Sequence, residues 1–279
     1  MEYHQINRTS TLTEDSVYDR YVSAFINDLP KNVMIIWSHA FHKMMNNAIE
    51  HSGSEIFHIL LCKDCLKTTI VIIDEGIGIF KKIQDFLGLE SLDDAIVELF
   101  KGKFTTDPAS HSGEGIFFTS RALDHFAAIS SGKIFKHDRY SYEGIIKNLK
   151  SIPSLQDWKN VTGTVIIMSL SNMSSRILAD VLNTYSDDEG DFVTTAIPVR
   201  NLFDDFPVSR SQARRLCAGL DRFKNVQLDF SGLEDIGQAF ADEIFCVYSG
   251  KHPNVIITPV NVSENVRRMI HRAVSRLPQ

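Results

Sequence analysis

Apolar residues recur at every third or fourth position over a long stretch near the start of the chain. From Val33 to Ala48 this spacing predicts an amphipathic helix, which we expect to end near Gly53. The preceding residues, 12–29, also have a helical pattern, and Pro30 stops it because proline cannot continue a helix. Residues 1–29 are therefore expected to form a helical lead-in to a domain that begins at residue 30.

Strand-like and helical patterns then follow one another up to residue 172. The run at 63–67 has the length of a hairpin turn between two β-rich segments. The polar run at 101–112 contains Gly102 and Pro108 and is expected to be a mobile loop. Strands are predicted at 56–62, 68–74 and 164–170, with others between 127 and 148, and helices at 79–87, 92–100 and 116–126.

An acidic, glycine-containing cluster at 186–191 separates this region from the rest of the chain. We place a linker with one short helix at 173–191 and a second domain at 192–279. Strands and helices alternate in the second domain, which predicts a sheet backed by helices. Its strands are predicted at 192–198, 226–230 and 255–260, and its helices at 209–223, 237–248 and 262–276.

Composition narrows the class of protein without naming a function. The apolar fraction of 43% and the charged fraction of 23% are ordinary globular values. A net charge of −6 provides no basic field that would attract nucleic acid. The chain has no run of about 18 apolar residues, and its four cysteines do not make a disulfide framework. We therefore expect a reduced, cytoplasmic protein that does not enter a membrane.

Four short motifs stand in order along the first domain. They are Asn46–Ala48 in the long predicted helix, Asp74–Gly78 directly after a strand, Gly113–Gly115 directly before a helix, and Gly163–Thr164 at the start of a late strand. Each motif alone is weak, because a D-x-G-x-G sequence after a strand is most often only a turn. All four in this order, each in the right local structure, indicate a nucleotide pocket.

The polar members of these motifs suit one nucleotide. The amide of Asn47 offers an oxygen to Mg²⁺, a hard cation that prefers oxygen ligands. The carboxylate of Asp74 can accept a hydrogen bond from the exocyclic amine of adenine, and a charged acceptor makes that bond strong. The hydroxyl of Thr164 can reach the base directly or through water.

The glycines suit the approach of the backbone to the ligand. Gly76 and Gly78 permit a left-handed backbone and a close approach to the base. Gly113 and Gly115 open the N-terminus of a helix, where free N–H groups and the positive end of the dipole suit a phosphate.

The order of the four motifs resembles that of the GHKL ATPases, which include gyrase-type topoisomerases, heat-shock chaperones, MutL proteins, histidine kinases and anti-sigma-factor kinases. The resemblance covers residues 30–172 and is closest to the bacterial regulatory members. It implies an α+β chain whose first domain is a GHKL (Bergerat) α/β sandwich, with helices on one face of a mixed sheet. It also implies ATP and Mg²⁺ as ligands and residues 101–112 as a lid. Related ATPases often form homodimers, but no segment here is specific to a dimer.

Lys43 departs from the family pattern. The residue four positions before the motif asparagine is normally a glutamate that acts as general base, and positions 43 and 47 share one helix face. A lysine is a cation near pH 7 and cannot accept a proton unless burial lowers its pKa greatly. Three interpretations stay open: an ATP sensor that barely hydrolyses, an engineered or selected variant that traps ATP, or a substitute base such as Glu50.

The second informative string, Leu228 to Gly237, delivers an Asp-Phe-Ser-Gly turn between a strand and a helix. It resembles STAS domains of anti-anti-sigma factors, and more specifically the STAS-like domains fused behind GHKL modules. In STAS proteins a serine at the start of the helix is phosphorylated, but residues 237–239 carry no hydroxyl here, and we do not transfer that role to Ser231. The resemblance implies a smaller α/β domain at 192–279 that binds a regulatory protein.

Several other groups have an ordinary interpretation that we prefer. Cys62 and Cys65 on the hairpin turn give too few zinc ligands even with His58 nearby. The basic cluster at 267–272 is expected to be a solvated helix face, and the aromatic residues Phe117, Phe118 and Phe240 are expected in the core. Phosphate contacts are a weaker alternative for Lys101 and Lys103, and His111 and Arg121 are as well explained by packing.

These inferences combine into a leading hypothesis of an ATP-binding signalling protein with weak or no hydrolysis. In it, ATP orders the 101–112 loop and alters the contacts of the STAS-like domain. The alternative is an active enzyme, either an ATPase or a Ser/Thr protein kinase of the anti-sigma-factor type. A third class is a scaffold that binds no nucleotide.

Overall fold

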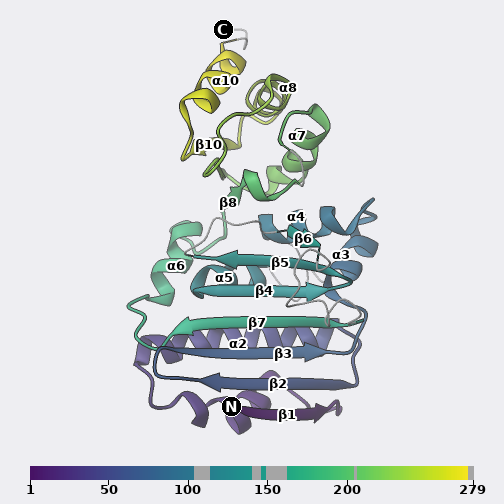
Figure 1. The fold of residues 1–279 in the computed structure, drawn as a ribbon, viewed down its shortest axis with the longest axis vertical. Helices are drawn as coiled ribbons and strands as arrows, with labels where there is room; N and C mark the ends of the chain where they lie inside the picture. The colour runs from purple at the N-terminus through teal and green to yellow at the C-terminus, as the bar shows by residue number, and fades with distance from the viewer. Residues whose placement is uncertain (104–113, 140–145, 149–161, 204–205, 276–279) are drawn as a thin grey trace.

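The computed structural model describes residues 1–103, 114–139, 146–148, 162–203 and 206–275. Figure 1 shows a large sheet with helices behind it, and a smaller unit that contains the C-terminus above one end of the helical layer. The chain is therefore a mixed α and β protein with a large antiparallel sheet, in agreement with the α+β class expected from the sequence.

The large sheet has seven strands in the order β1-β2-β3-β7-β4-β5-β6, and each of its described pairings is antiparallel. The mixed sheet implied by the family resemblance is therefore wrong for these strands. Strand β7 lies between β3 and β4 and runs antiparallel to both. The strands are β1 (Glu2–Asn7), β2 (Ile56–Lys63), β3 (Lys67–Asp74), β4 (His125–Ser130), β5 (Lys133–Asp138), β6 (Ile146–Asn148) and β7 (Thr164–Ser171).

Strand β1 was missed by the sequence pattern, which placed residues 1–29 in a helical lead-in. Only Ile6 of this strand is buried, so its alternation of apolar and polar positions is weak. The remainder of the lead-in forms short helical turns: α1 (Glu14–Val17), a π-helical turn (Tyr18–Val22) and a 3-10 turn (Ala24–Ile26).

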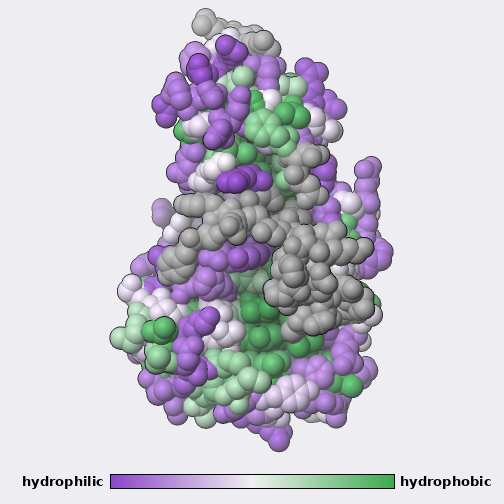
Figure 2. Space-filling model, in the orientation of Figure 1, coloured by the Kyte–Doolittle hydropathy of each residue, from purple (hydrophilic) through white to green (hydrophobic). Residues whose placement is uncertain are grey.

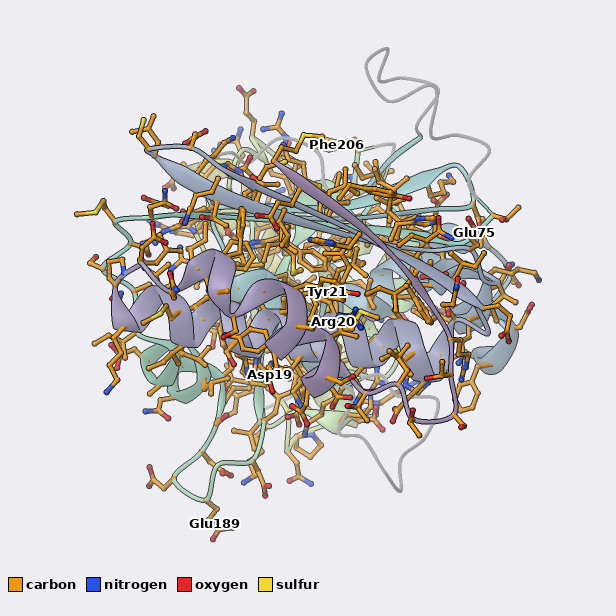
Figure 3. All side chains as sticks on the ribbon, turned by 90° about the horizontal axis from the view of Figure 1, so that it is seen from below. Asp19, Arg20, Tyr21, Glu75, Glu189 and Phe206 are labelled. Atoms are coloured by element: carbon orange, nitrogen blue, oxygen red, sulfur yellow. The ribbon has the colours of Figure 1, made fainter. Side chains whose placement is uncertain are left out.

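Helices cover one face of the large sheet (Figures 1 and 3). The longest is α2 (Lys31–His51), which starts directly after Pro30 and buries one side against the strands, as its periodicity predicts. The shorter helices of this layer are α3 (Ile79–Leu87), α4 (Leu92–Lys101), α5 (Gly115–Ala122) and α6 (Leu178–Tyr185). Apolar side chains of α6 pack on the same core, so the segment expected to be a linker is partly built into the fold.

The opposite face of the large sheet also carries hydrophobic side chains, because residues at alternate positions of a strand point to opposite faces. Figure 2 shows hydrophobic residues on this face. Residues Ile129, Ile134 and Val165 are buried there, and Val71, Ile73, Ala127 and Ile167 pack around them. Within the described residues, no helix combines the length and the apolarity needed to cross a bilayer.

The smaller unit is a three-stranded parallel sheet in the order β10-β9-β8, which matches the alternation of strands and helices in the sequence. Each strand is followed by a helical segment. The strands are β8 (Thr194–Pro198), β9 (Asn225–Asp229) and β10 (Ile256–Val260); the helices are α7 (Arg210–Cys217), α8 (Gln238–Asp242), a π-helical turn (Glu243–Tyr248), α9 (Ser249–Lys251) and α10 (Glu264–Val274).

Candidate functional site

The end of α2 lies against the loop that follows β3. The backbone N–H of Ile77 donates to the carbonyl oxygen of Ser52 at 3.0 Å, and Lys82 Nζ donates to the carbonyl oxygen of His51 at 2.8 Å. A Cβ on Gly76 would lie 2.0 Å from the Ser52 carbonyl oxygen. Gly76 is therefore required for this contact, which joins the first and second sequence motifs.

Asp74 and Thr164 are directly opposite each other on β3 and β7. Asp74 is 4% exposed, and its Oδ1 accepts a hydrogen bond from the Gly76 N–H at 3.0 Å. Burial raises the pKa of the Asp74 carboxyl, while hydrogen bonds from Gly76 and Thr164 oppose that rise. The carboxyl group is thus held in place by the second and fourth motifs together.

Position 163 requires glycine for a reason that the sequence did not reveal. A Cβ at this position would lie 1.8 Å from the Asp74 carbonyl oxygen and 2.8 Å from its Oδ1. Any side chain would displace Asp74, so glycine at 163 is needed to keep the carboxyl group where it is.

The loop after Asp74 is fixed by two further contacts. Gly78 has a φ of +83°, and a Cβ there would lie 2.3 Å from Ser130 Oγ, so both the backbone conformation and the space demand glycine. Thr164 Oγ1 accepts a hydrogen bond from the Ile79 N–H at 3.0 Å, at the start of α3. The Thr164 hydroxyl predicted to reach a base therefore holds Asp74 and α3 within the protein.

Lys43 is on the same helix as the first motif and lies close to Gly115 of the third motif. A Cβ on Gly115 would lie 3.6 Å from Lys43 Cδ, so the lysine stem passes close to the first residue of α5. Lys43 is exposed, and Asn47, one helical turn later, is half-buried. Gly113, the other predicted phosphate-binding glycine, lies outside the described residues. A cation and a helix N-terminus at one place form a suitable environment for an anion.

His39 is a member of this helix face that the sequence analysis did not single out. It lies one turn before Lys43, and burial lowers its pKa to about 4, with smaller contributions from the charges of Lys43 and His42. Among the described residues no partner lies within hydrogen-bond distance of its buried Nε2. This low pKa keeps His39 neutral at pH 7. The sequence signal that could have found His39 is its spacing of four residues from Lys43, which places both side chains on one helix face.

Glu50, the alternative base, is an exposed residue of the same helix. With the Asn46 amide oriented to satisfy both groups, its nitrogen donates to Glu50 Oε2 at 3.0 Å. The Glu50 carboxylate is thus beside Asn46, the neighbour of the predicted Mg²⁺ ligand.

Lys101 and Lys103, for which phosphate contacts were the weaker alternative, both have partners within the protein. Lys101 is fully buried, and its Nζ donates to Glu98 Oε1 at 2.6 Å and to the carbonyl oxygen of Ala218 at 2.8 Å. Lys103 Nζ donates to the carbonyl oxygen of Arg222 at 3.0 Å. Both ammonium groups join α4 to the smaller unit. Residues 104–112 of the predicted lid, and His111 with them, lie outside the described residues.

Arg121 and His58, both singled out from the sequence, have partners within the protein. Arg121 Nη2 donates to the carbonyl oxygen of Ala196 at 2.9 Å. His58, the third candidate zinc ligand, lies between Tyr3 and Glu75: Tyr3 Oη is 2.8 Å from its Nδ1, and Glu75 Oε1 is 3.0 Å from its Nε2. Glu75 is labelled in Figure 3. No cluster of three or more metal-ligating side chains is present within the described ranges.

In the smaller unit, the hydroxyl of Ser231 belongs to a turn. Asp229 Oδ1 accepts from the Ser231 N–H at 2.9 Å and from its Oγ at 2.6 Å, and Asn261 Nδ2 donates to the same oxygen at 3.0 Å. A Cβ on Gly237 would lie 2.5 Å from the Val208 carbonyl oxygen, which explains why no hydroxyl residue stands there. The basic residues of α10 are exposed, as expected: Arg267, Arg268, His271 and Arg272.

Comparison with known proteins supports one part of this description. A family model described as a STAS-like domain of unknown function (DUF4325) matches residues 212–267. A search of curated proteins found no match to the chain. The C-terminal unit is therefore STAS-like, as its sequence resemblance predicts.

Proposed function

We propose that residues 30–172 bind ATP with Mg²⁺ in a site of the GHKL type, and that the chain is a regulatory protein with little or no ATP hydrolysis. The observation that carries this proposal is that α2 contacts two motifs at once. Its end lies against Gly76, and Lys43 lies beside Gly115. Asp74 and Thr164, distant in sequence, are direct neighbours in the sheet.

The residues present fit a nucleotide. The buried Asp74 carboxyl accepts hydrogen bonds from Gly76 and Thr164. Its two oxygens offer about four acceptor sites when ionised, so one is left for the exocyclic amine of adenine. The Lys43 ammonium and the N–H groups at the start of α5 fit the phosphates. Asn47 supplies one amide oxygen to Mg²⁺, which keeps its other positions for phosphate and water.

Slow hydrolysis follows from the side chain at position 43. A general base must accept a proton from the attacking water, and a lysine ammonium has no lone pair for it. Lys43 is an exposed residue of α2. The same cation stabilises the triphosphate, so this substitution favours retention of ATP over turnover.

Isothermal titration of the full chain with ATP and Mg²⁺ tests the proposal. We expect a single site per chain that Asp74→Asn weakens. Asp28→Asn should leave it unchanged, because Asp28 is paired with Lys63 at the opposite end of β2 and β3 from Asp74. Titration with AMP separates the contribution of the phosphates from that of the base. No measurable heat with millimolar ATP, together with a melting temperature indifferent to ATP, would reject the proposal in favour of a scaffold.

Phosphate release measured in parallel distinguishes the rival enzyme. Steady turnover by the unaltered chain, lost on Asn47→Ala, would assign an ATPase or a Ser/Thr protein kinase instead. We also propose that the STAS-like domain binds a regulatory protein, and a binding partner that requires residues 192–279 is the expected result of cross-linking in cells.

A further inference from the structure

The helix that starts at the proposed phosphate site, α5, ends against the STAS-like domain. Helix α5 has eight residues, so it is roughly 12 Å long. Gly115 at its first position lies beside Lys43, and Arg121 near its end donates to the Ala196 carbonyl oxygen of β8. One rigid element therefore spans from the site to the second domain.

The sides of α5 also contact that domain. The ring centroid of Phe192, two residues before β8, lies 4.7 Å from that of Phe117 and 5.0 Å from that of Phe118. Phe192 is buried and in turn contacts Phe223 at 5.3 Å. A cluster of this kind is close-packed, so a displacement of α5 must move the rings of the STAS-like domain.

Helix α4, which precedes α5 in the chain, is held by the same domain. The buried Lys101 ammonium donates to the carbonyl oxygens of Arg215 and Ala218, at 3.1 and 2.8 Å, where α7 ends. In return, Thr195 Oγ1 donates to the Lys101 carbonyl oxygen at 2.7 Å. A buried ion that satisfies two carbonyls fixes one orientation of the two partners.

Two arginines add a charged rim to this contact. Arg222 Nη2 donates to Glu98 Oε2 at 2.8 Å, and Arg215 Nη2 lies 2.5 Å from Asp94 Oδ1. Both carboxylates belong to α4. The neighbouring Arg214 instead bridges Glu243 at 2.8 Å, inside the STAS-like domain.

From these contacts we infer that the STAS-like domain is a built-in regulator of the phosphate end of the site, because it docks on both α4 and α5. Docking holds Gly115 beside Lys43 and so strengthens nucleotide binding. By linkage, nucleotide binding strengthens docking by the same factor. A protein that pulls the STAS-like domain away from α4 thereby releases the nucleotide. This inference rests on the proposed function.

The test compares the ATP dissociation constant of the full chain with that of two docking variants. Lys101→Met removes the buried ammonium, and Arg215→Ala/Arg222→Ala removes the rim while leaving the core intact. Arg214→Ala is the matched control, since it deletes the neighbour of Arg215 on α7, whose guanidinium pairs with Glu243 inside the STAS-like domain. We expect ATP to bind at least about 5-fold more weakly to both docking variants, and Arg214→Ala to bind as the unaltered chain does.

Hydrogen exchange provides the reciprocal readout. Saturating ATP is expected to slow exchange of the amides at 210–222 in the unaltered chain, but not in Arg215→Ala/Arg222→Ala. If the unaltered chain does not bind ATP, the proposed function fails. If it binds ATP but both docking variants bind equally or more tightly, or if the amides at 210–222 are indifferent to ATP, the coupling alone is overturned.

Discussion

The side chain of Lys43 lies along the first residue of α5, so that a Cβ on Gly115 would be 3.6 Å from Lys43 Cδ. Lys43 is thus at the place where the proposed site would bind phosphate, at the position where the GHKL ATPases that the sequence resembles carry their base. Under the proposed function, position 43 would decide whether the site retains ATP or hydrolyses it.

Replacement of Lys43 by glutamate should turn the site into an ATPase. A positioned general base contributes about 10²–10⁴-fold to a rate, so Lys43→Glu is expected to increase phosphate release at least about 100-fold. Steady-state phosphate release at pH 7.5 measures this. Lys43→Gln removes the charge without supplying a base and should show no such gain, and Asn47→Ala should abolish the gain. A Lys43→Glu protein that binds ATP but stays inactive would show that more than the base is missing.

Substitution of Asp74 by asparagine should weaken ATP binding without lowering the stability of the fold. The raised pKa means that the folded state holds the Asp74 proton to higher pH than the unfolded state does. The wild-type chain therefore loses stability relative to Asp74→Asn as pH rises from the ordinary carboxyl value through the raised one. At pH 8 the variant is expected to unfold at the same or a higher urea concentration, yet to bind ATP at least about 10-fold more weakly. A variant that unfolds much more easily would give Asp74 a purely structural role.

Alanine at Gly163 should be far more costly than alanine at Gly115. The added Cβ at 163 would lie 1.8 Å from the Asp74 carbonyl oxygen, whereas at 115 the closest atom is a flexible lysine carbon at 3.6 Å. We expect Gly163→Ala to cost about 3 kcal/mol of unfolding free energy and Gly115→Ala to change it by less than about 1 kcal/mol. Urea unfolding followed by circular dichroism measures both. Equal effects would contradict the close approach of β7 to Asp74.

The half-buried His39 should make the chain less stable in mild acid. Its folded-state pKa of about 4 lies below the ordinary value of 6.5, so the unfolded chain takes up a proton that the folded chain refuses. Stability is therefore lost as pH falls from 6.5 towards 4. Between pH 7 and pH 5, His39→Gln is expected to lose about 2 kcal/mol less than the wild-type chain. His271→Gln on α10 is the control, because His271 is an exposed histidine. An unchanged pH dependence in His39→Gln would contradict this assignment.

Local sequence determined most of the secondary structure. The period of three to four residues gave α2 nearly to the residue, and the alternation of strands and helices gave the parallel sheet of the smaller unit. The string from Leu228 to Gly237 was sufficient for the STAS-like assignment that the family comparison supports. These features depend on neighbouring residues, whose backbone preferences are written in the sequence itself.

Tertiary structure alone decided which of those segments meet. The insertion of β7 between β3 and β4 places Thr164 opposite Asp74, and only that pairing explains Gly163. The sequence pattern predicts Lys101 as an exposed loop cation, but it is buried. The carbonyl oxygens that accept its hydrogen bonds are 114 and 117 positions away in the sequence, so no local pattern could reveal them. Sheet order and domain docking arise from packing between distant residues, and a single sequence carries no periodic signal for such contacts.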